Sequence, residues 1–178
     1  MKKYIAFVCI PLLIVLSSCD VDQLLLRGAP VTYEFTNDRL EDVQVNEDLV
    51  ELFTLTSDYE GNTAEIAAVY VGDQVRLDQD TVILYFHGKG NDMQLFWPRA
   101  ARMANWGGRQ HRFGVLMFDY RGFGNSGGTS ETIQTMQADG DACLKWLKDR
   151  GVTSDRVILY SESLGTFPAS HVAAYSEV

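Results

Sequence analysis

The chain has 178 residues, of which 46% are apolar and 11% aromatic, and it carries a formal charge of −9. This size and composition fit one globular core and argue against a disordered chain. The negative charge, with no basic cluster beyond Lys2-Lys3, argues against a nucleic-acid partner and against a basic face that binds anionic lipid.

The first residues have the pattern of an export signal. A short positive start is followed by the apolar stretch Tyr4–Leu16, which is about 13 residues long and therefore too short to span a bilayer comfortably. The stretch ends in Leu16-Ser17-Ser18-Cys19, which resembles a bacterial lipobox, in which the cysteine is acylated and becomes the new N-terminus. We therefore expect a lipoprotein signal peptide over residues 1–18.

Acylation of Cys19 implies an exported protein whose partner is a lipid bilayer. The family rule for enterobacteria reads Asp20, directly after the cysteine, as retention at the periplasmic face of the inner membrane. A plain signal peptide with an incidental cysteine and an uncleaved anchor helix are the alternatives.

The remaining cysteines and histidines support neither a disulfide nor a metal site. If Cys9 leaves with the signal and Cys19 is lipidated, only Cys143 is left, so no intramolecular disulfide is expected. The histidines are scattered without the spacing of zinc ligands; they are His87, His111 and His171. We expect no metal and no cofactor.

The rest of the chain divides into a tether and lead-in over residues 19–47 and a folded domain over residues 48–178. The domain opens with two predicted strands, Leu49–Thr56 and Glu65–Val71, which form a hairpin with turn residues around Gly61. Three continuous apolar runs then have the pattern of strands buried on both faces of a parallel sheet. These runs are Val82–Phe86, Val115–Phe118 and Val157–Tyr160.

Helical patterns separate the apolar runs. Apolar residues recur at helical spacing from Thr132 to Arg150, with Cys143 on the apolar stripe and Gly151 placed to end the helix. A shorter helix is predicted from Pro98 to Asn105. The alternation predicts an α/β fold with a mostly parallel sheet, an N-terminal hairpin and right-handed crossovers.

A distinctive loop follows each apolar run, where open α/β sheets bind their ligands. These loops are His87-Gly88-Lys89-Gly90-Asn91-Asp92, then Asp119-Tyr120-Arg121-Gly122-Phe123-Gly124-Asn125-Ser126-Gly127-Gly128, then Ser161-Glu162-Ser163-Leu164-Gly165. Because the carboxyl ends of parallel strands meet at one edge of a sheet, the three loops predict a single site.

The third loop matches a nucleophile elbow, the sharp strand-to-helix turn that presents a catalytic serine. We expect Ser163 to be the nucleophile and the backbone N–H of Leu164 to stabilise an oxyanion. The backbone N–H of Lys89, or of Gly90, is the expected second donor, and His87 is expected to hold its loop by a hydrogen bond. Ser161, where glycine is usual, departs from the pattern. The alternative is a serine that N-caps an ordinary helix.

The middle loop also contains Gly122-Phe123-Gly124-Asn125-Ser126-Gly127, which matches the dinucleotide pattern G-x-G-x-x-G. That pattern needs a helix that begins near Gly127 and an acidic residue at the end of the next strand. The predicted helix starts later, and Asp139 and Asp141 fall inside it. Nucleotide binding is therefore the weaker interpretation.

Together the three loops resemble the α/β-hydrolase superfamily, in particular its serine aminopeptidase-like and acylglycerol-lipase-like branch. The resemblance implies an α/β-hydrolase fold and a serine hydrolase that cleaves carboxylic esters, thioesters or small amides of a small-molecule acyl substrate. It implies no cofactor, and it makes Asp119 a structural residue of the cleft floor rather than the catalytic acid.

The family's acid and histidine follow the nucleophile in the order Ser, acid, His. Here the chain stops at Val178, soon after Ser163. His171 falls on the same predicted helix as Ser163 and faces away from it, and His111 is expected at the opposite edge of the sheet. We therefore expect a C-terminally incomplete fold whose acid and base are not in the chain, and an inactive 178-residue chain. The alternative is a truncated, non-catalytic lipoprotein with a hydrolase-like binding cleft. The oligomeric state stays open.

Overall fold

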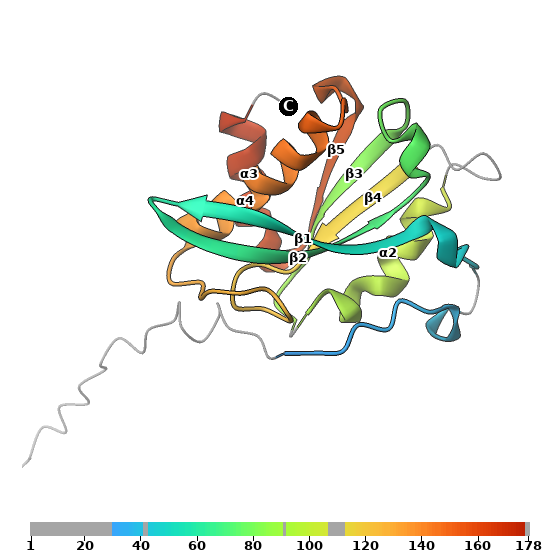
Figure 1. The fold of residues 1–178 in the computed structure, drawn as a ribbon, viewed down its shortest axis with the longest axis horizontal. Coiled ribbons are helices and arrows are strands. Elements are labelled where there is room, and N and C mark those ends of the chain that lie inside the picture. The colour runs from blue at the N-terminus through green and yellow to red at the C-terminus, as the bar shows by residue number, and fades with distance from the viewer. Residues whose placement is uncertain (1–29, 41–42, 91, 107–112, 177–178) are drawn as a thin grey trace, which may run out of the picture.

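The computed structural model describes residues 30–40, 43–90, 92–106 and 113–176. These residues form one five-stranded sheet in the order β1-β2-β4-β3-β5, with helices on both faces (Figure 1). The predicted signal peptide, Cys19, Asp20 and His111 lie outside the described residues.

The N-terminal hairpin is confirmed and is longer than predicted. Strand β1 (Val50–Tyr59) pairs antiparallel with β2 (Asn62–Val71) along its whole length. The turn is only Glu60-Gly61, and both residues have positive φ angles, 52° and 85°. A two-residue turn with two positive φ angles matches the twist of a hairpin, so the strands pair up to the turn itself.

The three apolar runs form the strands β3 (Thr81–Phe86), β4 (Phe113–Phe118) and β5 (Val157–Ser161). β3 pairs in parallel with both β4 and β5, as predicted. The α/β-hydrolase fold is confirmed, but the sheet is evenly mixed rather than mostly parallel, because β2 returns from the hairpin antiparallel to β4. β4 is an interior strand of the described sheet.

Among the described residues, three α-helices cover the sheet: α2 (Trp97–Ala104), α3 (Ile133–Asp149) and α4 (Thr166–Tyr175). α3 begins after Thr132, whose side chain accepts a bond from the Thr135 N–H, and Gly151 follows its end with φ 87°. Cys143 is fully buried on the inner stripe of α3, as predicted, and burial raises the pKa of its thiol. Short 3₁₀ turns complete the fold: η1 (Asn37–Arg39), η2 (Glu47–Leu49), η3 (Gln74–Arg76), η4 (Met93–Phe96), η6 (Ser154–Arg156) and η7 (Ser163–Gly165).

A hydrophobic core lies on each face of the sheet. α3 and α4 pack on one face against side chains such as Leu84 and Phe86, and α2 packs on the other against Ile83 and Tyr85. Successive residues of β3 thus point into different cores, which explains its continuous apolar run. β5 is half-buried, with Ile158 45% exposed, because it is the edge strand of the described sheet.

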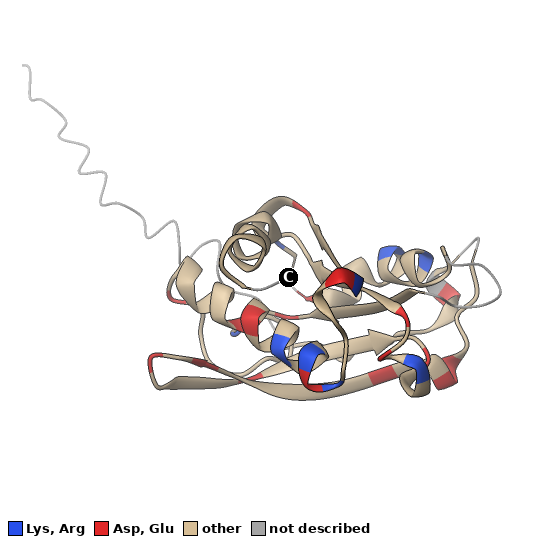
Figure 2. Cartoon of the chain, turned by 90° about the horizontal axis from the view of Figure 1, so that it is seen from above, with Lys and Arg blue, Asp and Glu red and all other residues tan. Residues whose placement is uncertain are grey.

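Charged side chains of both signs are spread along the chain, and the basic ones in Figure 2 are interspersed with acidic ones rather than gathered on one face. Within the ranges that the structure describes, no helix is both long and apolar enough to cross a membrane.

Candidate active site

The structure brings the three predicted loops together at the carboxyl ends of β3, β4 and β5. The Tyr120 hydroxyl of the second loop donates to the backbone carbonyl of His87 in the first, at 2.9 Å. The first loop in turn lies against the third, because a methyl group added at Gly88 would lie 3.2 Å from Cβ of Ser163. This convergence was predicted from the parallel order of the strands.

Ser163 lies at the turn between β5 and α4, with its side chain exposed and a φ angle of 49°. A left-handed backbone at a residue with a side chain costs about 1–2 kcal/mol, so it persists only where the surroundings impose it. The sharp strand-to-helix turn with a strained, exposed serine is the geometry of a nucleophile elbow. Glu162 precedes η7 as its N-cap and Gly165 precedes α4, so Ser163 is not the N-cap of either.

Gly165 explains how the turn can be so tight. A Cβ atom at this position would lie 2.3 Å from the backbone oxygen of Phe86 and 2.6 Å from that of His87. Both contacts are with backbone atoms, so no side chain could be accommodated by small adjustments. Ser161, which stands where glycine is usual, is the last residue of β5 and pairs with Phe86 of β3. It is only partly buried, so its side chain fits.

Glu162, between the two serines, ties the elbow to both neighbouring elements. Its carboxylate accepts hydrogen bonds from the Tyr85 hydroxyl of β3 and from the Arg99 guanidinium of α2. Burial, followed by the bond to Glu162, raises the pKa of Tyr85, which therefore stays a neutral donor. The sequence pattern assigned no role to Glu162, because its hydrogen-bond partners Tyr85 and Arg99 are distant from it in the chain.

His87 is fully buried and holds its own loop, as predicted. Its Nδ1 lies 2.7 Å from the backbone oxygen of Gly88, and its Nε2 lies 3.0 Å from Oδ1 of Asp119. Asp119 is also fully buried, and its Oδ2 accepts a hydrogen bond from the Tyr33 hydroxyl. Neither Nε2 of His87 nor Oδ1 of Asp119 makes a well-aligned hydrogen bond within the described part of the chain.

The second loop is locked by a buried ion pair that the sequence analysis missed. The Arg121 guanidinium donates to Oδ1 of Asp139 from Nε at 3.0 Å and from a terminal nitrogen at 2.8 Å, and both side chains are fully buried. The same guanidinium reaches Ser57 and the Asn62 carbonyl of the hairpin. Desolvation raises the pKa of Asp139, and the bonds from Arg121 oppose that shift. The sequence feature that could have predicted this ion pair is the acidic residue Asp139 on the buried stripe of α3.

The internal bonds of the glycine-rich loop argue further against nucleotide binding. The Gly122 N–H donates to the Gly127 carbonyl at 3.1 Å, and the Gly127 N–H donates to the Glu65 carbonyl at 2.7 Å. A phosphate group would need such N–H groups to be available. In addition, α3 begins only at Ile133, after the glycine pattern has ended.

The two predicted oxyanion donors lie in different loops. Leu164 follows Ser163 as the second residue of η7, with its side chain buried, and Lys89 lies exposed in the loop after β3, next to Gly88. His171 is held elsewhere: its Nε2 lies 3.1 Å from Oδ2 of Asp141 on α3, which fits the expectation that it faces away from Ser163.

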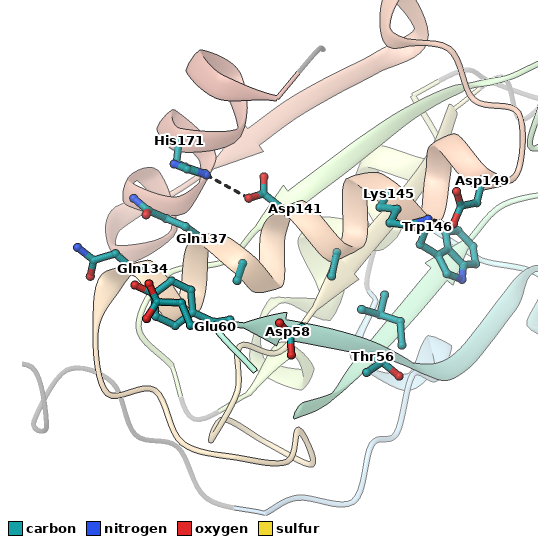
Figure 3. A pocket seen from close by; sticks show the side chains of 14 residues that line it. Thr56, Asp58, Glu60, Gln134, Gln137, Asp141, Lys145, Trp146, Asp149 and His171 are labelled. Carbon is teal, nitrogen blue, oxygen red and sulfur yellow. Dashed lines mark hydrogen bonds and ion pairs between the residues drawn. The ribbon is translucent and has the colours of Figure 1, made fainter. Parts of the chain in front are cut away.

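Two cavities open on the surface away from these loops. One, of about 790 Å³, lies between the hairpin and α3, and Figure 3 shows the residues of β1 and α3 that line it, among them Thr56, Asp58 and Lys145. The other, of about 350 Å³, is lined in part by Glu51 and Arg150. Neither includes a residue of the three loops. Across the described ranges, no three acidic, histidine or cysteine side chains form a group that could hold a metal ion.

Comparison with known proteins agrees with the fold. The chain is 32% identical over 84 residues to the uncharacterized protein YfhR of Escherichia coli, a match that covers 47% of this chain and 28% of YfhR. It is 28% identical over 99 residues to the uncharacterized protein R595 of Acanthamoeba polyphaga mimivirus, covering 54% and 32% of the two chains. The chain thus spans less than a third of the length of these curated relatives.

Among solved structures, the esterase Pf2001 of Pyrococcus furiosus superposes with a TM-score of 0.58 and 20% identity, over 85% of this chain and 55% of the esterase. A hydrolase of Agrobacterium vitis, described as putative, superposes with a TM-score of 0.53 and 22% identity, over 67% and 43% of the two chains. The sequence profile of the family described as serine aminopeptidase, S33, matches residues 78–177, which contain all three loops. The chain therefore belongs to the serine aminopeptidase S33 family of α/β-hydrolases.

Proposed function

We propose that this protein contributes the nucleophile and the oxyanion donors of a serine hydrolase that cleaves esters, thioesters or small amides of small acyl compounds. The observation that carries the proposal is Ser163, which is exposed and held at a φ angle of 49° between β5 and α4. Membership in a hydrolase family supports a hydrolytic function. The similar fold of a protein described as an esterase supports an acyl substrate.

In the proposed reaction, Oγ of Ser163 attacks the acyl carbonyl and forms a tetrahedral intermediate. The backbone N–H groups of Leu164 and Lys89 stabilise its negative oxygen, as preorganised donors do in acyl transfer. Collapse of the intermediate releases the alcohol, thiol or amine and leaves an acyl-enzyme, which water then hydrolyses. We place the acid and the base outside these 178 residues, because His87 and His171 are bound to Asp119 and Asp141.

The test is a fluorophosphonate probe applied to a native lysate, with the labelled serine identified by mass spectrometry. We expect a labelled protein larger than the 20.0 kDa of this chain, modified at Ser163. Ser163→Ala should abolish labelling, and the matched variant Ser161→Ala should retain it. Labelling that survives Ser163→Ala would refute the assignment of the nucleophile.

The isolated chain provides a second arm of this experiment. We expect residues 1–178 to hydrolyse p-nitrophenyl acetate no faster than their Ser163→Ala variant. Rapid hydrolysis through Ser163 would show that a base within the chain activates the serine. No labelling at any size would favour the alternative, a non-catalytic lipoprotein that uses the cleft for binding.

We also propose that Cys19 is acylated and anchors the protein at the periplasmic face of the inner membrane, as the lipobox-like sequence and Asp20 suggest. Cys19→Ala should move the protein from the membrane fraction to the soluble fraction and remove the mass of the acyl chains. An unchanged mass and distribution would contradict the proposal, and Cys143→Ala is the matched control.

A further inference from the structure

The segment over residues 30–37, called the N-terminal strap below, is bonded to the loops around the candidate site. The Val31 N–H donates to the side chain of Asn125 in the second loop, at 3.1 Å. Further along, the Gln94 side chain of η4 donates to the Glu34 carbonyl at 2.6 Å. Trp97 of α2 donates to the Thr36 carbonyl at 2.8 Å. The strap was expected to be part of a tether, yet it is attached to three elements of the domain.

Tyr33 lies in the middle of the strap, with its hydroxyl in the second loop. The hydroxyl donates to Oδ2 of Asp119 and accepts from the Asn125 N–H at 2.9 Å. Burial, and then the charge of Asp119, raises the pKa of Tyr33, so the phenol keeps its proton. Gly124 leaves the space for this contact, because a Cβ atom there would lie 2.1 Å from Oδ2 of Asp119 and 2.5 Å from the Tyr33 hydroxyl.

A continuous chain of contacts leads from this hydroxyl to the nucleophile. Asp119 lies 3.0 Å from Nε2 of His87, and Nδ1 of His87 lies 2.7 Å from the Gly88 oxygen. Gly88 then lies against Ser163, so that an added methyl group would come within 3.2 Å of its Cβ. His87 and Asp119 are fully buried, so bulk solvent does not reach the contact between them.

The chemistry of these contacts makes Tyr33 the group that orients Asp119. A carbonyl oxygen can only accept, so Nδ1 of His87 carries the proton that bonds Gly88. The other side of the ring meets Asp119 without a well-aligned hydrogen bond. Within the described part of the chain, the aligned hydrogen bond to the Asp119 carboxylate comes from Tyr33. Without it, the carboxylate could rotate and the His87 ring would lose its fixed orientation.

We propose that Tyr33 is a positioning residue that holds the loop His87–Gly90 in place beside Ser163, acting through Asp119 and His87. The inference rests on the proposed function, because it makes the strap a support for the loop that carries the oxyanion donor Lys89. It also assigns a role to a segment outside residues 78–177, the part that matches the family profile.

The test compares Tyr33→Phe with Tyr59→Phe in the whole gene product. Both variants remove one phenolic hydroxyl, but Tyr59, at the hairpin end of β1, lines the cavity between the hairpin and α3, which includes no residue of the three loops. The first readout is amide hydrogen exchange of Gly88 and Lys89, which does not depend on catalysis. We expect faster exchange at both amides in Tyr33→Phe and wild-type exchange in Tyr59→Phe. Wild-type exchange in Tyr33→Phe would overturn the proposal.

The second readout is the kinetics of ester hydrolysis. Displacement of an oxyanion donor should lower kcat by roughly 10- to 100-fold with little change in KM. An unchanged kcat in Tyr33→Phe, while Ser163→Ala is inactive, would overturn the positioning role and leave the nucleophile intact. If Ser163→Ala stays active, the proposed function fails instead, and the exchange data still decide whether Tyr33 holds the loop.

A milder variant keeps the test decisive if Tyr33→Phe does not fold. Asn125→Ala removes an exposed side chain that bonds the backbone of Val31 but leaves Tyr33 in place. It should loosen the strap and raise the exchange of Gly88 and Lys89 by a smaller factor. No increase at these amides would contradict the proposal.

Discussion

The loops after β4 and β5, which lie on either side of the loop after β3, are built in opposite ways. The loop after β4 follows an interior strand, and its charged groups are buried and bonded, with Arg121 held by Asp139 and by the hairpin. The loop after β5 follows the edge strand, exposes Ser163 and carries a strained backbone. A strained residue persists only when its surroundings hold it, and here the strained loop shares one edge of the sheet with a loop whose Arg121 is held in a buried ion pair.

The link between the two loops is the loop after β3. Tyr120 of the loop after β4 donates a hydrogen bond to this loop. On its opposite side, Gly88 and Gly165 allow its backbone to lie close to the turn that carries Ser163. Substitutions that break the bonds of the loop after β4 should therefore lower the free energy of unfolding. A substitution that relaxes the strained backbone at Ser163 should raise it.

The largest effect is expected from Asp139→Ala. It leaves the Arg121 guanidinium buried without its carboxylate, and breaking a buried ion pair costs about 3–5 kcal/mol. The free energy of unfolding, measured by urea denaturation, should fall by that amount. The control is Asp141→Ala on the same helix, whose side chain is 41% exposed and should cost less than about 1 kcal/mol. Equal losses would show that the buried pair does not stabilise the loop.

A smaller loss is expected from Gly165→Ala. The added methyl group would meet the backbone oxygens of Phe86 and His87, and such overpacking costs about 1–3 kcal/mol. Gly127→Ala is the matched control, because its nearest neighbours would lie at an ordinary 3.6 Å. The midpoint of urea denaturation measures both, and a Gly165→Ala variant as stable as Gly127→Ala would refute the tight elbow.

The smallest effect is expected from Ser163→Gly, and it has the opposite sign. Glycine adopts a positive φ without strain, so the variant should gain about 1 kcal/mol of stability while it loses the hydroxyl of the proposed nucleophile. The control is Ser170→Gly within α4, where glycine should cost about 0.5–1 kcal/mol relative to alanine. Thermal denaturation compares the two, and a loss of stability in Ser163→Gly would mean that the elbow stores no strain.

Local patterns were enough to predict the strands, the longer helices and the elbow. A continuous apolar run reports burial on both faces of a strand, and a serine two residues before a glycine that opens a helix reports a sharp turn. These signals need only neighbours in the chain. For this reason β3, β4, β5 and α3 were predicted within a few residues of their observed bounds.

The partners of the buried polar groups could not be predicted in this way. Tyr33 and Asp119 are 86 positions apart, and Arg121 and Asp139 are 18 apart. The antiparallel pairing of β2 with β4 also depends on where the hairpin meets the rest of the sheet. A residue's own pattern shows that it is polar and near a strand end, but its partner is chosen by how the layers pack. The sequence thus determined the elements and the candidate nucleophile, whereas the tertiary structure decided which groups hold that nucleophile in place, because buried polar groups must find partners across the fold.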